Sequence, residues 1–392
     1  MFFNFMLALK LYIIAIFRGG KYGTPLRPYR IFCLAVMVPL FLLLIIINWI
    51  CLGVDNVFFP GFRKVKIKAP VFIFGVPRSG ATHIHRTMSK DTQFTSFQLW
   101  ELLFAPSVVQ RKLFMLIGCL DALLLFGLMY KIIRAMDWLL FKMTYDIRRV
   151  SLFENEEDDL LLLNTFSTIF ITFMFPYFEQ ARKIFYFDHL MSEKEKQFIM
   201  ARYKGCIQRH LYFHGPDKIF LSKSPMFSFK IESIQKMCPD VRVINPVRTP
   251  MELVPSDFSL QELFFKMFGM KLQNIMDHKH ELMEIIYNWY MHPVEQRHNF
   301  APERFFISRF DDLVKDLEMH MRNIYATFNI SLNPEFELKL KEESMRSRGY
   351  VSRNTYSLEQ FGLDRKEVIT TYKPVFDALQ FDIPGPVDSQ AA

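Results

Sequence analysis

The chain has 392 residues, more than the usual size of one domain, and a large α/β domain with an added segment fits this length. Apolar residues make up 51% and aromatic residues 16%, enough for an extensive core and for additional surface that faces lipid. The net charge of +8 suits an anionic ligand or an anionic membrane surface, but the scattered lysines and arginines do not indicate nucleic acid binding. The five cysteines form no CxxC pair, so neither a disulfide framework nor a zinc site is indicated.

The N-terminal residues 1–60 are predicted to anchor the protein in a membrane. Residues 31–52 contain no charged side chain, and a helix of that length reaches roughly 33 Å, enough to cross a bilayer core. A buried helix of a soluble protein is the alternative. Residues 1–17 predict an interfacial or second anchoring helix. Basic residues flank the apolar run on both sides, so the orientation across the membrane stays open.

Beyond residue 60, short apolar strands alternate with helices. The sequence predicts strands over 70–76, 218–225, 241–250 and 303–313, with a helix over 79–90 directly after the first. This alternation predicts an α/β fold of the P-loop type, with three α/β/α layers and a mainly parallel central sheet. In such sheets ligands bind at the carboxyl ends of the strands.

One large domain is therefore expected over residues 61–385, followed by a loose tail over 386–392. Residues 90–180 are predicted to form a mainly helical insertion. Within it, the apolar runs 113–130 and 160–178 are each short of a comfortable membrane span, so buried or membrane-grazing helices are expected.

The stretch VFIFGVPRSGATHIHRTM, from Val71 to Met88, has the glycine spacing of a phosphate-binding loop. Gly75 and Gly80 are five residues apart, as in G-x-x-x-x-G-K-[ST], but Ala81 stands where the lysine belongs. Such a loop still binds phosphate through backbone N–H groups and a helix N-terminus, and Arg78 supplies positive charge. A simple glycine-bearing turn is the alternative.

A second anion site is indicated by VINPVRTPMELVPSDF, which follows another predicted strand. Arg248 lies eight residues before Ser256, a spacing that lets an arginine and a hydroxyl converge on one phosphate. Two phosphate sites on one sheet imply a ligand that is phosphorylated at two places.

Together the two motifs resemble the sulfotransferases that use 3′-phosphoadenosine 5′-phosphosulfate (PAPS), in particular the branch with a P-R-S-G-T-T loop, which includes bacterial-type and protein-tyrosine sulfotransferases. The resemblance covers most of the chain from Val71 to Val368. It assigns the 5′-phosphosulfate to a loop and the 3′-phosphate to Arg248 and Ser256. The loop residues so assigned are Arg78, Ser79, Gly80, Ala81, Thr82 and His83. Ala81 stands where the family has a threonine. The lost hydroxyl predicts weaker binding of the donor, and a catalytically inactive relative of the family is the alternative.

Sulfuryl transfer needs a held donor, positive charge at the departing phosphate and a base near the acceptor. Lys223 and Arg78 are expected to supply the charge. Glu101 is the candidate base, because it lies 23 residues after Arg78, as in the protein-tyrosine branch. Burial beside Trp100 is expected to raise its pKa. The rival base lies in an acidic cluster made of Glu154, Glu156, Glu157 and Asp158.

Near the carboxyl end, residues 347–363 resemble the basic loop that closes over the nucleotide in this family. The candidate donor-binding residues there are Arg348, Gly349, Arg353 and Tyr356. No metal site is predicted, since His83 and His85 do not share a helix face.

The expected activity is sulfuryl transfer from PAPS to a hydroxyl or amine of an acceptor that is lipid-like, a sterol or a membrane-presented glycan. The N-terminal helix is expected to hold the protein at a membrane, that of the Golgi if the source is eukaryotic. Two alternatives remain: a kinase-like phosphotransferase, which the missing lysine and missing magnesium-binding acid disfavour, and a catalytically inactive protein of the same fold. The sequence determines neither the acceptor nor the oligomeric state.

Overall fold

A computed structural model describes residues 2–142, 150–271, 276–347 and 356–383. Five strands form one parallel sheet in the order β2-β3-β1-β4-β5. The strands are β1 (Val71–Ile73), β2 (Phe94–Thr95), β3 (Ile219–Lys223), β4 (Arg242–Val247) and β5 (Phe305–Arg309). All four predicted strands are confirmed. The sequence missed β2, which has only two residues and therefore shows no periodicity.

Helices cover both faces of the sheet, as predicted. The helices N-terminal to β3 are α1 (Phe2–Phe17), α2 (Pro28–Phe32), α3 (Val38–Phe58), α4 (Ala81–Met88), α5 (Leu99–Phe104), α6 (Val108–Leu124), α7 (Leu128–Phe141), α8 (Phe170–Met174), α9 (Phe178–Phe185), α10 (Phe187–Leu190) and α11 (Glu193–His214). Those that follow β3 are α12 (Ile231–Met237), α13 (Pro250–Met267), α15 (Lys279–Gln296), α16 (Phe310–Lys315), α17 (Leu317–Thr327), α18 (Pro334–Ser347) and α19 (Arg365–Leu379).

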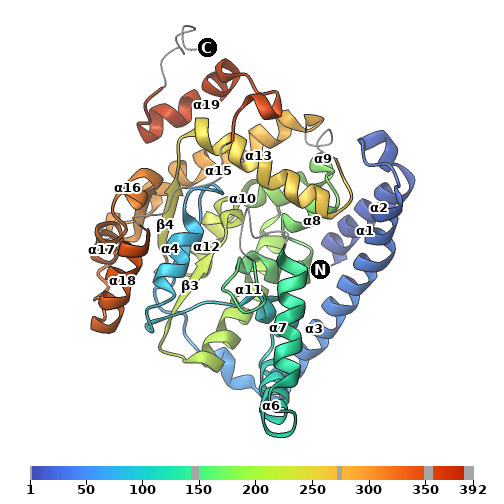
Figure 1. Ribbon diagram of the computed structural model, residues 1–392, viewed down its shortest axis with the longest axis vertical. Helices are drawn as coiled ribbons and strands as arrows, with labels where there is room; N and C mark the ends of the chain where they lie inside the picture. The colour runs from blue at the N-terminus through green and yellow to red at the C-terminus, as the bar shows by residue number, and fades with distance from the viewer. Residues whose placement is uncertain (1, 143–149, 272–275, 348–355, 384–392) are drawn as a thin grey trace.

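Side-chain alternation along the central strand divides the core into two layers. Val71 and Ile73 point to one face, where they pack in a cluster with α4, α17 and α18, whereas Phe72 packs on the opposite face with α11, α12 and α15 (Figure 1). Both faces of β1 are buried, which is typical of a parallel strand between two helical layers. The predicted three-layer α/β/α architecture is confirmed.

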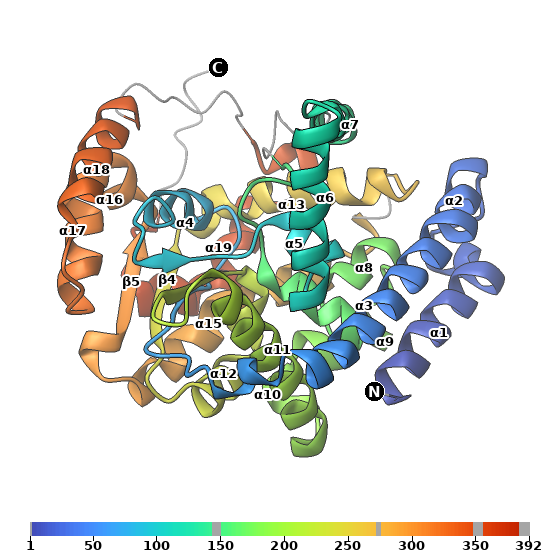
Figure 2. The ribbon, with the colours of Figure 1, turned by 90° about the horizontal axis from the view of Figure 1, so that it is seen from below.

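The N-terminal helices run side by side along one edge of the molecule (Figure 2). Residues Pro28–Phe58 form one helical stretch, long and apolar enough to cross a membrane, with a π-turn over Cys33–Met37. Polar groups bind this stretch to the domain along its length. Arg30 donates to the carbonyl oxygen of Met174 at 2.9 Å, and Asp55 pairs with Arg209 at 2.8 Å. The domain boundary expected near residue 60 stays a prediction, because this helical stretch packs on the rest of the chain.

The two apolar runs of the insertion differ from each other. Residues 113–130 are helical, in α6 and α7, as expected. Most of their large side chains are exposed, so of the two expected alternatives burial is wrong there and a membrane-grazing helix stays a prediction. Residues 160–178 are mostly buried, in a 3₁₀ segment (Asp158–Thr165) followed by α8, rather than in one continuous helix.

Candidate functional site

The loop between β1 and α4 is held tightly at its two glycines. Gly75 has φ +154°, and a Cβ there would lie 2.5 Å from the carbonyl oxygen of Pro246. Gly80 has φ +89°, and a Cβ there would lie 2.6 Å from the Leu313 side chain. Only glycine fits both positions without strain. The spacing that suggested a phosphate loop therefore reflects a compact loop wedged between β4 and α16.

Beyond the loop, α4 presents an uncapped N-terminus. The first N–H groups of an α-helix have no partners within the helix, and no side chain caps α4. Thr82 and His83 are half-buried in this first turn, while Ala81 packs its methyl group into the core. Ser79 is buried and donates to the carbonyl oxygen of Val76 at 2.5 Å, so its hydroxyl shapes the loop. The geometry suits an anion at the helix end.

The two predicted phosphate motifs meet at the carboxyl ends of β1 and β4. Arg78 Nε donates to Ser256 Oγ at 2.9 Å, and Arg248 Nη1 lies 3.5 Å from the carbonyl oxygen of Arg78. Arg248 is also positioned by Glu252 at 2.8 Å and by the ring of Phe310 at 4.3 Å. Residues separated by about 170 positions in the chain thus form one basic edge, as the resemblance requires.

Lys223 ends β3 directly beside the loop. In the sheet register it is the partner of Ile73, and its side chain is only 2% exposed. Its ammonium group pairs with the carboxylate of Glu157 at 2.8 Å. Lys223 is therefore not a solvated surface residue. One member of the acidic cluster that was considered as a rival base lies against it.

The two aspartates that follow Glu157 in the chain are buried and serve the fold. Asp158 accepts hydrogen bonds from Tyr203 and, at 2.8 Å, from Ser222, and burial raises its pKa to about 6. Asp159 pairs with the buried Lys230 at 3.0 Å. These contacts attach the start of the 3₁₀ segment Asp158–Thr165 to α11, β3 and Lys230, which positions the preceding Glu157.

The structure places Glu101 in a closed ionic cluster. Its side chain accepts from His214 at 2.7 Å, pairs with Arg111 at 3.1 Å and is 1% exposed. Burial acts to raise its pKa, but Arg111, His210 and His214 outweigh that effect and hold the pKa at about 2. The expectation of a raised pKa is wrong, because the sequence showed the apolar neighbours of Glu101 but not the cations folded against it.

The same cluster brings three potential metal ligands close together. One ligand atom each of Glu101, His210 and His214 lies within 4.8 Å of the others. The guanidinium group of Arg111 already supplies the positive charge beside the carboxylate, however, and would repel a cation. Electrostatics therefore favours a structural ion pair at this position.

Part of the predicted C-terminal loop lies outside the described residues, namely Arg348, Gly349 and Arg353. Tyr356 is described, and its ring centre lies 6.0 Å from the guanidinium carbon of Arg78. A residue 278 positions away along the chain is thus brought to the loop arginine, and its role in donor binding stays a prediction.

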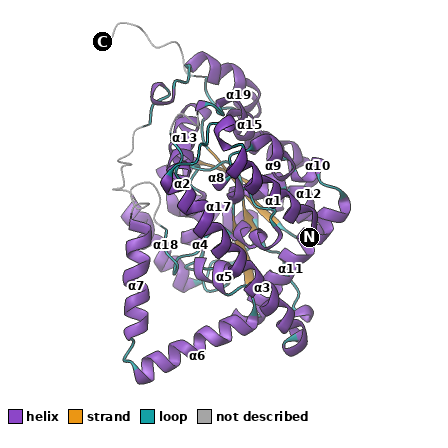
Figure 3. Ribbon diagram, turned by 90° about the vertical axis from the view of Figure 1, so that its right-hand side faces the viewer, coloured by secondary structure: helices purple, strands orange, loops and turns teal. Residues whose placement is uncertain are grey.

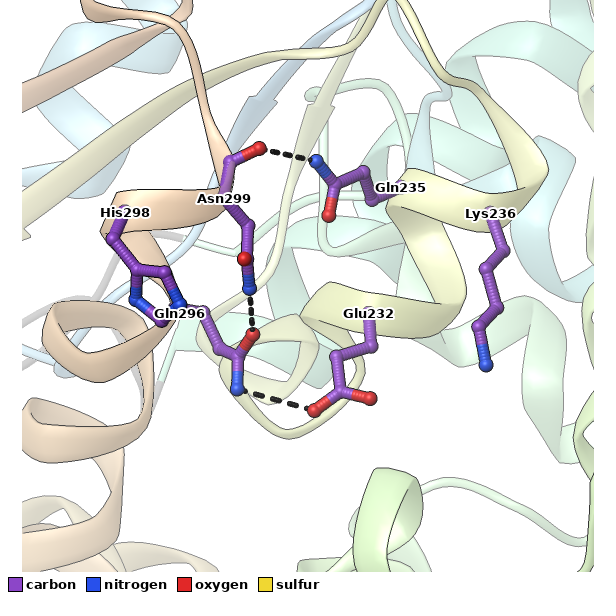
Figure 4. A pocket seen from close by; sticks show the side chains of 6 residues that line it. All are labelled: Glu232, Gln235, Lys236, Gln296, His298 and Asn299. Atoms are coloured by element: carbon purple, nitrogen blue, oxygen red, sulfur yellow. Dashed lines mark hydrogen bonds between the residues drawn. The ribbon is translucent and has the colours of Figure 1, made fainter.

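A surface pocket lies away from this basic edge. It is lined by Glu232, Gln235, Lys236, Gln296, His298 and Asn299 (Figure 4). From its walls the chain passes into the beginnings of β4 and β5, not their carboxyl ends. Its polar groups largely bind one another, with Gln235 donating to the Asn299 carbonyl oxygen at 2.8 Å and Gln296 to Glu232 at 3.1 Å.

Comparison with known proteins agrees with this geometry. The profile of the sulfotransferase family matches residues 146–334, which include Lys223, Arg248 and Ser256. This match spans just under half of the chain, so the chain is similar to the sulfotransferase family. Among curated proteins, the chain is 25% identical over 260 residues to the omega-hydroxy-beta-dihydromenaquinone-9 sulfotransferase Stf3 of Mycobacterium bovis. The alignment covers 65% of this chain and 61% of the length of Stf3.

Solved structures show the same fold. Sulfotransferase STF1 of Mycobacterium tuberculosis aligns with a TM-score of 0.70 at 17% identity, over 95% of this chain and 92% of STF1. Sulfotransferase STF9 of Mycobacterium avium aligns with a TM-score of 0.67 at 19% identity, over 85% and 82% of the two chains. The fold class predicted from the sequence is confirmed.

Sequence analysis missed residues whose partners are distant in the chain. Arg111 and His210 lie in helical stretches with no motif, and their pairing with Glu101 has no local signal. Glu157 was named only as part of an acidic run. A mainly parallel sheet was predicted, and this arrangement sets Lys223 beside the loop. The ion pair between Lys223 and Glu157 was not predicted.

Proposed function

We propose that the protein transfers a sulfuryl group from PAPS to a hydroxyl group of a lipid-like acceptor. The observation that carries this proposal is the single basic edge formed by Arg78, Arg248 and Ser256, with contacts of 2.9 and 3.5 Å. Two anion-binding motifs that meet at the carboxyl ends of adjacent strands suit a donor with phosphates at both ends of one nucleoside.

The described residues fit such a donor. The tight glycine loop, Arg78 and the uncapped N-terminus of α4 would hold the 5′-phosphosulfate, with Thr82 at the first helical turn. Arg248 and Ser256 would hold the 3′-phosphate, each charge-assisted hydrogen bond contributing roughly 1.5–3 kcal/mol. PAPS, when bound, supplies the sulfuryl group that is transferred.

Lys223 and Glu157 are the residues we assign to the transfer. Lys223 would stabilise the negative charge that develops on the departing phosphate. Glu157, 2.8 Å from Lys223, would accept the proton of the acceptor hydroxyl. At the same time the hydroxyl oxygen of the acceptor bonds to sulfur, and the bond between sulfur and the bridging phosphate oxygen breaks. Glu101 is less suited to this step, because Arg111, His210 and His214 hold its pKa at about 2, which makes its carboxylate a weak base.

The lipid-like acceptor is supported by two observations. The curated relative Stf3 is named for a menaquinone-derived acceptor. In this chain the insertion between residues 90 and 180 exposes large apolar side chains on α6 and α7. The same insertion carries Glu157, which lies against Lys223.

The helical stretch Pro28–Phe58 is the proposed attachment to a membrane, supported by its length and apolar composition. Residence in the Golgi membrane stays a prediction for a eukaryotic source.

Nucleotide-induced thermal stabilisation tests the donor assignment. We expect 3′,5′-bisphosphoadenosine to raise the melting temperature of the purified protein more than ATP with Mg²⁺ does, because Ala81 replaces the lysine that a triphosphate needs. The opposite ranking would favour the kinase-like alternative.

Turnover is tested by incubating the protein with radiolabelled PAPS and a membrane lipid extract. Label in the organic phase supports transfer to a lipid. Label only in soluble protein would contradict the acceptor class, and donor binding with no labelled product in lipid, glycan or protein fractions would favour the inactive alternative.

A further inference from the structure

The hairpin of α6 and α7 (Val108–Phe141) carries apolar side chains on all sides. The two helices meet at a bend of 117° and form a corner that extends from the body (Figure 3). At the tip, Leu124 is 65% exposed and Phe126 is 86% exposed. Along α7, adjacent residues such as Ile132 and Ile133 are both exposed, so no single face of the helix is covered. A helix at the surface of a soluble protein normally keeps one polar face towards water.

The polar groups at the tip are satisfied inside the hairpin. Asp121 is 4% exposed, and its carboxylate accepts the backbone N–H groups of Met129 at 2.9 Å and Tyr130 at 3.0 Å. Its carbonyl oxygen accepts those of Leu125 at 2.9 Å and Gly127 at 3.1 Å. The acid in this apolar run therefore caps the first turn of α7. Backbone that enters hydrocarbon must have its hydrogen bonds made within the protein, and this turn meets that requirement.

The exposed charges on the hairpin are all basic. Between residues 108 and 142, all of which the structure describes, both acids are buried; Asp137 accepts from Ser151 at 2.8 Å and from the N–H of Leu152 at 2.7 Å. The exposed charged residues in that range are Lys112, Lys131, Arg134 and Lys142. Basic side chains beside apolar surface are attracted to the anionic headgroups of a membrane.

The hairpin also begins beside the predicted anchor. Asp55, near the end of α3, accepts the N–H groups of Val108 at 2.8 Å and Val109 at 3.0 Å, the first residues of α6. Exposed apolar side chains on α3, such as Ile46 and Ile50, lead towards this junction. A membrane that meets α3 is therefore close to the base of the hairpin.

We propose that the α6–α7 hairpin inserts into one leaflet of a lipid bilayer without crossing it. Each helix is too short for a comfortable span, with 17 and 14 residues, and the bend prevents the pair from acting as one straight helix. A second copy of the chain is a poorer occupant, because a protein interface covers one face of a helix pair and this hairpin is apolar on all faces. Asp137 connects the hairpin to the segment that leads to Glu157, so insertion brings the membrane surface to the proposed acceptor side.

Depth-dependent quenching of an attached fluorophore tests the insertion. The full-length protein, with Cys51→Ser and Cys119→Ser to remove the cysteines that are not buried, is labelled at Phe126→Cys or, as a matched control, at Leu338→Cys. Leu338 is 66% exposed on α18, in the opposite helical layer. Each variant is reconstituted in vesicles of phosphatidylcholine with a minor fraction of phosphatidylglycerol.

We expect nitroxides on the lipid acyl chains to quench the label at position 126 and aqueous iodide to leave it bright, with the reverse result at position 338. Equal quenching by iodide at both positions would overturn the proposal. Shielding of position 126 from both quenchers, lost on dilution in detergent, would replace the membrane by a second copy of the chain.

This inference is separable from the proposed reaction. Stabilisation by 3′,5′-bisphosphoadenosine, measured on the same labelled proteins, reports the donor site alone. Quenching of the label by lipid nitroxides without stabilisation by the nucleotide would support insertion of the hairpin and reject the donor assignment. Stabilisation by the nucleotide without quenching by lipid nitroxides would support the donor assignment and reject insertion.

Discussion

The carboxyl edge of the sheet and the helical region between residues 96 and 214 use charged residues in opposite ways. At the sheet edge, Arg78 and Arg248 are only partly buried and converge with a hydroxyl. In the helical region, Glu101 and Arg111 are fully buried and paired with each other. Charges that converge at a partly open edge can serve a ligand, whereas charges closed off from water serve the fold. Lys223 and Glu157 lie where the two regions meet.

The largest effect is expected from breaking the buried pair. Glu101→Gln leaves Arg111 buried without its counter-charge, which should lower the free energy of unfolding by about 3–5 kcal/mol. Thermal or urea denaturation measures it. The matched control is Glu335→Gln, which removes an exposed carboxylate paired with Lys339 and should change stability little.

If Glu101 serves the fold alone, the folded fraction of Glu101→Gln should keep its turnover. A loss of turnover with unchanged stability would instead return Glu101 to the role of base.

A somewhat smaller effect, on the rate of turnover, is expected from changing Lys223, which lies between the two regions. Lys223→Met should lower kcat by about 10²–10³-fold, because the charge that stabilises the departing phosphate is lost. Because this change also removes the buried cation that pairs with Glu157, the double variant Lys223→Met with Glu157→Gln controls for stability. Turnover with radiolabelled PAPS is the measurement, and normal turnover in the folded double variant would refute both assignments.

At the sheet edge, Arg248→Ala should weaken binding of 3′,5′-bisphosphoadenosine by about 1.5–3 kcal/mol, roughly 10- to 150-fold, without a comparable loss of stability. Arg242→Ala, at the other end of the same strand, is the matched control and should bind normally. Calorimetric titration measures both. Equal weakening in the two variants would mean that general charge, and not the site, attracts the nucleotide.

The smallest effect depends on pH. Asp257 is fully buried beside Ser256, and burial raises its pKa to about 6. Because the pKa of Asp257 is raised in the folded state, keeping its carboxylate ionised above pH 6 lowers the free energy of unfolding of the protein. As the pH falls from 6 towards 4 the carboxyl becomes protonated and this cost disappears. Asp257→Asn should therefore be more stable than wild type at pH 8, by about 1–3 kcal/mol, with the gap closing by pH 4. Paired melting curves at the two pH values measure it, and a gap independent of pH would contradict the assignment.

The sequence by itself determined the elements whose signals are local. The apolar strands at 70–76, 218–225, 241–250 and 303–313 could be predicted because parallel strands are buried on both faces, and the glycine loop because its spacing is short. The order of these elements along the chain was sufficient for the three-layer fold and for placing Arg78 and Arg248 at one sheet edge.

Only the tertiary structure decided the environment of the individual side chains. Glu101 has apolar neighbours in sequence, but Arg111 and His214 fold against it and lower its pKa instead of raising it. The run 113–130 is apolar enough to be buried, yet none of the described residues packs over most of it, and Asp121 turns inward to cap a helix. Pairing, burial and exposure depend on which segments distant in the chain come together, and no local pattern of residues encodes that.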